Sequence, residues 1–386
     1  MNKNYDVIII GAGFAGATVA RKLAEAGKSI LVIEKRNHIG GNAYDYYNSD
    51  GVLIHKYGPH IFHANNQEVF EFVRKYTDWY DYQHKVVANV HGKEMPVPFN
   101  LNSLYIAYDE EKANRIEKKL IETYGAEQKV TILELKKNTD PELKELAQYV
   151  YDNVFVYYTM KQWGKTPEEI DPNTTARVPV FISRDDRYFQ DAFQGMPKDG
   201  YTKIFDNMLN HENIEVLTGV DALDKLTLAE GEILFEGEVF EGEVVYSGAV
   251  DYLFGNCYGS LPYRTLDFVF ETFDKDYVQS HGTINYTVSE DYTRITEFKH
   301  MTGQILPGKT TTCKEYSKSY SGAEEEIPYY AIINDENNAL YQKYFEKANQ
   351  YKNLHLIGRL AEYKYYNMDA IIERALDLAS KLCPEV

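Results

Sequence analysis

The chain has 386 residues, of which 44% are hydrophobic and 26% charged, the balance of a globular protein large enough for two or three domains. Its formal net charge of −18, from 59 acidic and 41 basic side chains, disfavours nucleic-acid binding, because phosphate recognition needs a basic surface. An anionic substrate would therefore have to be held by a few placed arginines and not by the overall field.

The cysteines and the hydropathy pattern predict a cytoplasmic protein. Cys257, Cys313 and Cys383 lie far apart without CxxC spacing, which predicts neither a metal site nor a disulfide framework. No apolar run is long enough for a membrane span. Residues 7–20 are apolar but are interrupted by glycines and lack the basic segment of a signal peptide, so we expect a buried strand and helix there.

The first predicted elements form a βαβ unit. Residues 5–10 are a continuous β-branched run, typical of a parallel strand buried on both faces. The loop at residues 11–16 has GxGxxG spacing and opens a helix that extends to about residue 26. Residues 29–33 form a second apolar strand, which ends at Glu34.

This arrangement predicts a dinucleotide site. Gly11 permits the tight turn, Gly13 lets the backbone approach a pyrophosphate, and Gly16 allows close helix packing. The helix N-terminus receives the phosphate charge, and Glu34 accepts a hydrogen bond from a ribose hydroxyl.

Two further features favour FAD over NAD. The doublet Gly40-Gly41 follows the second strand and resembles the second FAD signature of glutathione-reductase-like flavoproteins. Near the other end, residues 354–382 read as strand, glycine, loop and helix, so that a helix N-terminus can face the flavin ring. A second GxGxxG, which a nicotinamide domain would need, is missing from the sequence.

The middle of the chain changes character twice. Residues 100–165 are rich in Glu, Lys, Leu and Ala with apolar residues at helical spacing, as in 110–124 and 141–151, which predicts a helical insertion. From about residue 175, short alternating strands predict an antiparallel sheet, with strands at 267–273, 283–288 and 293–299.

Later segments return to the first domain. We predict a helix at 201–210, strands at 214–218, 244–248 and 354–358, and a closing helix at 369–382. The predicted fold class is α/β, with a discontinuous Rossmann-type FAD-binding domain (1–80, 194–255 and 351–386), an inserted helical domain (100–165) and an antiparallel sheet domain (81–99, 166–193 and 256–350).

Several longer segments resemble one family, the bacterial UDP-galactopyranose mutases. They are EKRNHIGGNA at 34–43, HKYGPHIFH at 55–63, YTMKQWG at 158–164 and GRLAEYKYY at 358–366. The resemblance extends over nearly the whole chain. It implies an isomerase that interconverts UDP-galactopyranose and UDP-galactofuranose without net redox change, for cell-surface glycans. It also implies FAD that is active when reduced, with its N5 attacking the anomeric carbon. We expect a cytoplasmic homodimer.

The same resemblance implies the site residues. It assigns Arg177 and Arg294 to the diphosphate, Tyr158 and Trp163 to the uracil pocket, and His60 and His63 to positions beside the flavin, where either orients the ring or holds a proton near N5. The expected catalytic set is Arg177, Arg294, His60 and His63. The other expected substrate contacts are His84, Phe155, Tyr158, Thr159, Trp163, Tyr188, Asn285, Tyr329 and Tyr365. The expected cofactor contacts are Gly11, Gly13, Phe14, Ala15, Gly16, Glu34, Lys35, Gly41, Asn42, His60, Ile61, Arg359, Tyr366, Asn367 and Met368.

Some positions depart from the family pattern. Asn367 stands where several relatives carry Asp, which removes a charge beside the flavin. The loop 288–291 is one residue shorter than in enterobacterial members and lacks their proline. Val154 and Tyr157 replace a Phe and a Gly of those members. These departures concern substrate contacts and leave the expected fold and reaction unchanged.

Two other functional classes share parts of the pattern. An amine-oxidase-like FAD oxidoreductase has the same fold and glycine doublet but has no need for paired arginines among tyrosines. A non-catalytic Rossmann-fold binding protein that has lost FAD is disfavoured by the intact set of Gly11, Gly13, Gly16 and Glu34.

Overall fold

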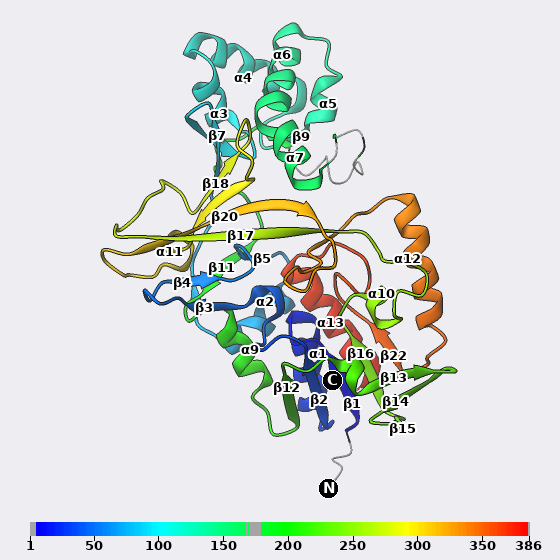
Figure 1. Cartoon of the computed structure of the whole chain (residues 1–386). Coiled ribbons are helices and arrows are strands. Elements are labelled where there is room, and N and C mark those ends of the chain that lie inside the picture. The colour runs from blue at the N-terminus through cyan, green and yellow to red at the C-terminus, as the bar shows by residue number, and fades with distance from the viewer. Residues whose placement is uncertain (1–4, 165, 167–168, 170–178, 385–386) are drawn as a thin grey trace.

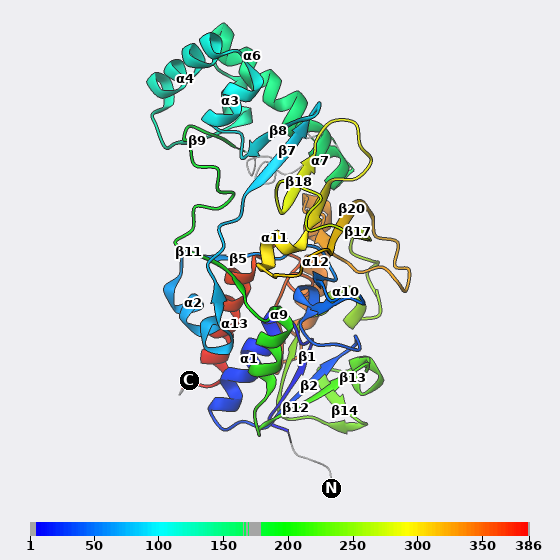
Figure 2. The same ribbon diagram turned by 90° about the vertical axis from the view of Figure 1, so that its left-hand side faces the viewer.

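The structure is a computed structural model that describes residues 5–164, 166, 169 and 179–384. Its elements lie in three tiers (Figure 1), with a parallel sheet and its helices at the bottom, a long sheet across the middle and a group of helices at the top. The turned view shows the same three tiers (Figure 2).

The lowest tier is a five-stranded sheet in which every pair of neighbours is parallel. In spatial order its strands are β12 (Ile214–Thr218), β2 (Ile30–Glu34), β1 (Val7–Ile10), β16 (Glu243–Tyr246) and β22 (Leu354–Leu356). Strands β1 and β2 are almost wholly buried, as their uninterrupted apolar sequences predict. One face packs on α1 (Phe14–Glu25), α9 (Tyr201–Leu209) and α13 (Met368–Leu382).

The opposite face of this sheet has a second core, which includes Ile8, Leu31 and Val244. The covering elements are α10 (Val250–Leu253), α12 (Asp335–Ala348) and the small sheet β13 (Leu226–Ala229), β14 (Glu232–Phe235) and β15 (Glu238–Val239). The Rossmann-type α/β fold predicted from the sequence is therefore confirmed, with strands that come from three separate parts of the chain.

The middle tier is a seven-stranded sheet. In spatial order it contains β21 (Tyr330–Ala331), β17 (Tyr263–Phe273), β20 (Thr310–Ser319), β19 (Arg294–Glu297), β18 (Thr283–Tyr286), β7 (Val86–Val90) and β8 (Lys93–Val97). Its pairs are antiparallel, as predicted, except that β18 and β7 run parallel. The strand predicted at 293–299 is shorter than expected, because the chain turns into α11 (Phe298–Thr302) after Glu297.

The top tier is helical and has its own core. It comprises α3 (Leu101–Ala107), α4 (Glu110–Tyr124), α5 (Ile132–Lys136), α6 (Pro141–Val150), the π-helical turn η3 (Tyr151–Phe155) and α7 (Val156–Trp163). Side-chain caps begin the two long helices, where Asp109 accepts from the Lys112 N–H group and Asp140 from the N–H groups of Glu142 and Leu143. The helical insertion predicted from composition is present.

The remaining elements are short. They are η1 (Gly41–Ala43), β3 (Asp45–Tyr47), β4 (Leu53–His55), β5 (Phe62–Ala64), α2 (Gln67–Val73), η2 (Arg74–Tyr76), β6 (Trp79–Tyr80), β9 (Lys129–Thr131), β10 (Pro179–Phe181), β11 (Phe193–Pro197) and η5 (Ala222–Asp224). Over the described residues, no helix is both long and apolar enough to cross a membrane. The domain boundaries given above remain a prediction.

Candidate active site

Glycines shape the loop between β1 and α1. Gly11 has φ +103°, a backbone conformation that residues with a side chain rarely adopt. A Cβ at Gly16 would collide with the carbonyl oxygen of Gly11. A Cβ at Gly13 would lie 3.6 Å from the Cα of Gly41, so the two glycine motifs face each other. Together they form a cradle in which backbone N–H groups can approach an anion closely.

Glu34 ends β2 with a buried carboxylate at the edge of this cradle. Its Oε2 accepts a hydrogen bond from the Ala12 N–H group (2.8 Å), and its Oε1 accepts one from the Arg36 N–H group (2.9 Å). An acceptor therefore lies beside the glycine loop, where a ribose hydroxyl is expected. The Lys35 ammonium, which was also expected at the cofactor, forms an ion pair with Asp221 (2.8 Å).

Two features of the cradle fit a dinucleotide. Helix α1 begins at Phe14 without a side-chain cap, so the N–H groups of its first turn, including that of Ala15, can receive a phosphate. Nη1 of Arg36 is buried and has no hydrogen-bond partner in the described part of the chain, whereas Nη2 donates to Oδ1 of Asn42 (2.9 Å). An unpaired buried guanidinium N–H is a ready donor to a dinucleotide.

The chain returns to the cradle after β22. Gly358 has φ +105°, and a Cβ there would lie 3.8 Å from the Cβ of Ala15. Helix α13 then begins at Met368, and its N-cap residue Asn367 forms no side-chain cap. Helices α1 and α13 pack against each other, and Ile61 packs on the same core. The N-termini of α1 and α13, both without a side-chain cap, therefore have backbone N–H groups available to a ligand at the cradle.

Charged side chains from the C-terminal segment lie near α13. Arg359 donates through Nε to the carbonyl oxygen of Tyr366 (2.6 Å), and its guanidinium carbon lies 4.7 Å from the ring centroid of Tyr365. In the first turn of α13, Oδ1 of Asp369 is buried without a hydrogen-bond partner among the described residues. Burial raises the pKa of the Asp369 carboxyl group. A guanidinium, a carboxyl oxygen without a partner among the described residues and a helix N-terminus fit the polar edge of a flavin ring.

His60 is neutral in this environment. Burial is the main cause that lowers the pKa of His60 to about 3, and the nearby His55, Arg359 and Arg294 lower it further. Its backbone N–H donates to Nδ1 of His55 (3.1 Å), and its own Nδ1 lies 2.9 Å from the carbonyl oxygen of Gly58. Because a carbonyl oxygen only accepts, Nδ1 of the neutral ring carries the proton and Nε2 is left as an acceptor. Of the two roles predicted for it, this geometry favours orienting a ring over holding a proton.

The rings of His63 and His84 both lie near the ring of Phe189. The His63 ring stacks on the Phe189 ring with centroids 3.7 Å apart, and its Nδ1 lies 3.2 Å from Oδ2 of Asp191. The His84 ring centroid is 6.1 Å from the same phenyl ring. Burial, followed by the charges of Arg294 and His63, lowers the pKa of His84 to about 3. His84 therefore lies near Arg294, on the side predicted for substrate.

Helix α7 brings aromatic side chains to the sheet. The turn η3 precedes it, and such π-helical turns within helices are frequent at functional sites. Phe155 and Thr159 are buried in this segment. Burial raises the pKa of Tyr158 to about 12, and the charge of nearby Arg294 opposes this rise. Trp163 ends the helix with its ring 6.0 Å from that of Tyr330.

A cavity lies between the end of α7 and the segment after β22. Its lining is mainly aromatic and basic, and consists of Trp163, Tyr329, Tyr330, Ala331, Ile333, Arg359, Lys364 and Tyr365. The Tyr330 ring is 4.6 Å from the Tyr329 ring and 6.1 Å from the Tyr365 ring. The hydroxyl of Tyr329 donates to the carbonyl oxygen of Tyr57 (2.8 Å), which fixes its position. Aromatic faces beside cations suit a nucleotide.

Arg294 lies on β19 beside a buried carboxylate. Its Nε donates to Oε1 of Glu315 on β20 (2.7 Å), and the Glu315 side chain is only 2% exposed. Burial, the largest single influence, would lower the pKa of the Arg294 guanidinium. The charge and hydrogen bond of Glu315 together with nearby Tyr158 and Tyr330 outweigh it and raise the pKa well above its usual value. Glu315 is its one hydrogen-bond partner among the described residues. The rest of the guanidinium fork is therefore available to an anion.

Asn285 faces Arg294 across the β18–β19 pair. The two residues are register partners. Asn285 is 8% exposed, and its Oδ1 is buried with no hydrogen-bond partner among the described residues. A buried acceptor without a donor is costly, so this oxygen is suited to a ligand hydroxyl. Tyr188, another expected contact, has its ring 5.9 Å from that of His84.

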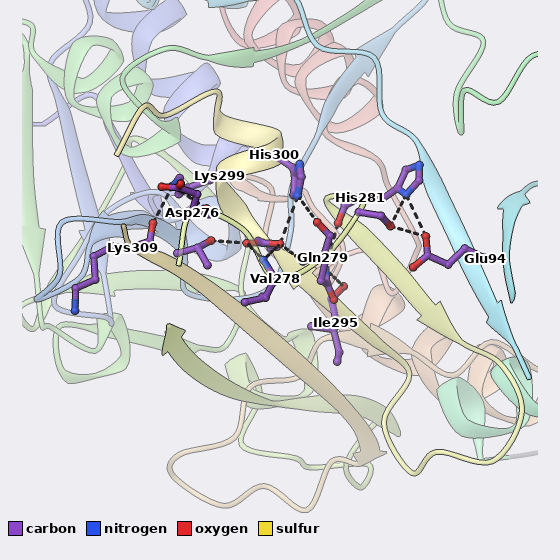
Figure 3. A network of polar contacts seen from close by, with 12 residues as sticks. Glu94, Asp276, Val278, Gln279, His281, Ile295, Lys299, His300 and Lys309 are labelled. Atoms are coloured by element: carbon purple, nitrogen blue, oxygen red, sulfur yellow. Dashed lines mark hydrogen bonds and ion pairs between the residues drawn. The ribbon is translucent and has the colours of Figure 1, made fainter. Parts of the chain in front are cut away.

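A network at the end of β19 fixes the strand that carries Arg294 (Figure 3). The fully buried Glu297 accepts from the N–H groups of Val278 (3.0 Å) and Gln279 (2.7 Å) and from the hydroxyl of Thr310 (2.6 Å). His300 lies 3.4 Å from the same carboxylate. Because these contacts join the end of β19 to the loop before β18, to the start of β20 and to α11, the strand has little freedom to move.

Not every predicted residue can be placed. Arg177, expected to contact the diphosphate, lies outside the described residues. Two arginines that follow it in the sequence already have partners, since Arg184 pairs with Glu117 (2.6 Å) and Arg187 with Asp185 (2.7 Å).

Three residues of the site were missed from the sequence. Arg36, Glu315 and Tyr330 are polar or aromatic side chains in segments where such residues are common. Only Glu315 left a usable signal: it alternates with Cys313 on one strand, and both are buried. An acidic residue in phase with a buried position predicts a buried ion pair.

Comparison with known proteins supports this description. Residues 153–365 match a family model described as UDP-galactopyranose mutase, and residues 9–76 match an NAD(P)-binding Rossmann-like domain. The chain is 40% identical to a dTDP-fucopyranose mutase of Escherichia coli over 98% of both chains. It is 34% identical to the UDP-galactopyranose mutase of Mycoplasma pneumoniae, over 98% of this chain and 96% of the relative.

Solved structures agree on the fold. A crystal structure of reduced UDP-galactopyranose mutase superimposes with a TM-score of 0.73 at 16% identity, covering 100% of this chain and 95% of the other. At that identity the likeness concerns the fold alone.

Proposed function

Because the chain belongs to the UDP-galactopyranose mutase family of sugar-nucleotide isomerases, we propose that it interconverts UDP-galactopyranose and UDP-galactofuranose. The observation that carries the proposal is the placement of Arg294. It lies on β19 beside Asn285, whose Oδ1 has no partner among the described residues. Its charge acts on Tyr330, which lines the aromatic cavity together with Arg359. Family membership disfavours the amine-oxidase-like and non-catalytic alternatives.

Family membership implies a flavin cofactor, and we propose FAD in its reduced state. The residues that would hold it are Gly11, Gly13, Phe14, Ala15, Gly16, Glu34, Arg36, Gly41, Asn42, His60, Ile61, Arg359, Tyr366, Asn367 and Met368. The chemistry supplied there by a reduced flavin is nucleophilic attack on the anomeric carbon without net redox change. Neutral His60 would accept a hydrogen bond through Nε2 and so orient the ring, and Arg359 would provide a positive charge beside it.

The protein's own part in catalysis is to hold the nucleotide. As the anomeric bond breaks, negative charge develops on the diphosphate, and the fixed guanidinium of Arg294 stabilises that charge. We assign Arg177 the same role. Trp163 and Tyr158 hold the nucleoside, while Tyr188, Tyr329, Tyr365, Asn285 and His84 surround the sugar and phosphates.

A second candidate substrate is a dTDP-fucose. The E. coli relative that acts on dTDP-fucopyranose has 40% identity, above the 34% of the Mycoplasma enzyme. The two substrates differ in the base methyl group, the ribose 2′-hydroxyl and the hydroxyl on sugar carbon 6. A pocket built to bond the 6-hydroxyl would reject the sugar without it strongly.

One assay tests both candidates. Dithionite-reduced enzyme is incubated under nitrogen with UDP-galactofuranose and, separately, with dTDP-fucofuranose, and the pyranose products are quantified by chromatography. We expect faster conversion of the UDP-sugar, with no stoichiometric consumption of reductant. A faster reaction of the dTDP-sugar would replace the proposed substrate. Equal turnover by oxidised enzyme would refute the role assigned to the reduced flavin.

We also propose a cytoplasmic location and a homodimer. The three cysteines, which are free thiols, support the first proposal. Analytical ultracentrifugation of the holoenzyme tests the second, which a single monomeric species would contradict.

A further inference from the structure

Helix α7 and the turn between β18 and β19 are joined by a lysine. The ammonium of Lys161 donates to three backbone carbonyl oxygens, that of Tyr286 at the end of β18 (2.5 Å) and those of Glu290 (2.9 Å) and Tyr292 (3.0 Å) in the turn. A lysine has three N–H donors, so all of them are used. The half-buried Lys161 ammonium forms no ion pair with another described residue, and the carboxylates whose charges act on it, those of Glu290 and Asp291, belong to the turn itself. Its bonds to backbone therefore fix a conformation of the turn.

A second contact joins the same two elements. The hydroxyl of Thr287, a buried residue of the turn, donates to the carbonyl oxygen of Asn153 (2.5 Å). Asn153 lies within η3, where the π-helical pattern leaves backbone groups without their usual α-helical partners. The turn is thus attached to the helix at two points.

The sheet holds the C-terminal end of α7 as well. The buried Arg264 on β17 donates to the carbonyl oxygens of Gln162 (3.1 Å) and Lys161 (3.2 Å), and Ser317 on β20 donates to that of Gln162 (2.7 Å). These bonds satisfy carbonyl groups that a helix end leaves unpaired. Helix α7 therefore cannot slide along the sheet without breaking polar contacts at both ends.

These contacts connect two halves of the ligand site. Tyr158 and Trp163 flank Lys161 on α7, while Asn285 and Arg294 flank the turn that Lys161 holds. We propose that Lys161 is a positioning residue, which fixes the separation between the aromatic nucleoside side and the diphosphate-binding side of the site. This inference rests on the proposed function for its ligand, a nucleoside diphosphate.

A positioning role and a purely structural role of Lys161 predict different effects on ligand binding. When two subsites are held at the right spacing, a ligand that spans them gains affinity that neither fragment has alone. Loss of the lysine should therefore weaken UDP much more than it weakens uridine or pyrophosphate. It should also raise KM more than it lowers kcat, because the groups at the reacting centre remain in place.

The experiment compares Lys161→Met with the wild-type holoenzyme and with Lys144→Met, a matched change at an exposed lysine on α6. Titration calorimetry gives the Kd for UDP, and displacement of UDP gives the Kd values for uridine and pyrophosphate. We expect Lys161→Met to weaken UDP by about tenfold or more and each fragment by less than about threefold. The Lys144→Met variant and the flavin absorbance should be unchanged.

Thr287→Val provides an independent variant, because it removes the second contact with little change of shape. It should weaken UDP in the same selective way, by a smaller factor, even if Lys161→Met does not fold. Unchanged UDP affinity in a folded variant, or an equal loss for UDP and both fragments, would overturn the proposal. Wild-type protein that does not bind UDP would instead contradict the proposed function.

Discussion

Replacing Arg294 separates its contribution to catalysis from its contribution to stability. The guanidinium is buried and uses Nε for Glu315, so the rest of its fork is available to the diphosphate. Removing one partner of a buried charged pair costs about 2–5 kcal/mol, and each 1.4 kcal/mol is a factor of about ten. Arg294→Ala should therefore lower kcat/KM with UDP-galactofuranose by between about 30-fold and about 5,000-fold. Arg294→Lys should recover only part of this loss, because an ammonium cannot form the bidentate contact.

The same substitution leaves the Glu315 carboxylate buried without its partner. Such a change destabilises a protein by about 3–5 kcal/mol, so the melting temperature should fall as well. The double variant Arg294→Ala/Glu315→Gln removes the unpaired charge and should regain most of the melting temperature, as measured by scanning calorimetry of the holoenzyme. Its steady-state activity should stay low. If the double variant regained activity together with stability, the role of Arg294 at the diphosphate would be refuted.

Two further predictions concern the aromatic cavity and the buried histidines. Trp163→Ala should weaken UDP binding by about 1–3 kcal/mol, the value of a base stacked on an aromatic ring, while FAD content stays intact. Loss of FAD with unchanged UDP affinity in calorimetry would show that Trp163 does not belong to the nucleoside-binding side of the site. Burial lowers the pKa of His55 to about 3, so below about pH 6.5 the unfolded chain takes up a proton that the folded protein does not. Stability should therefore fall with decreasing pH, and His55→Leu should remove about 2 kcal/mol of that loss between pH 7 and pH 5 in urea unfolding. An identical pH dependence of the variant and the wild type would show that His55 is not the residue responsible.

Elements with strong local patterns were predicted well from the sequence. The strand Ile214–Thr218 and the helix Glu110–Tyr124 were predicted with the bounds that the structure has. Both have local signals: β-branched residues at alternate positions (Ile214, Val216 and Thr218) in the strand, and apolar residues at helical spacing between Asp109 and Gly125 in the helix. The glycine loop and Glu34 could be located for the same reason, because their function depends on a local spacing.

Features that depend on tertiary contacts were predicted less well. The strand at Arg294–Glu297 ends earlier than its alternating sequence indicates, because the Glu297 side chain is held by the loop before β18 and by Thr310 of β20. The chain then enters the short helix α11, whose C-cap residue Gly303 has φ +66°. The Arg294–Glu315 pair joins residues on neighbouring strands 21 positions apart, and sequence spacing alone does not fix the strand register.

The order of strands in the parallel sheet has a consequence for synthesis. Strands β1 and β2 are made first, but β1 is completed on its other side only by β16, and β22 comes more than 100 residues later. At a translation rate of about 5–20 residues per second, an edge of the first strands stays unpaired for tens of seconds. An unpaired strand edge is a site for aggregation. Helix α13, whose N-terminus contributes to the cradle, is made later still. The nucleotide-binding end of the protein therefore forms late in translation, and cofactor loading follows synthesis of nearly the whole chain.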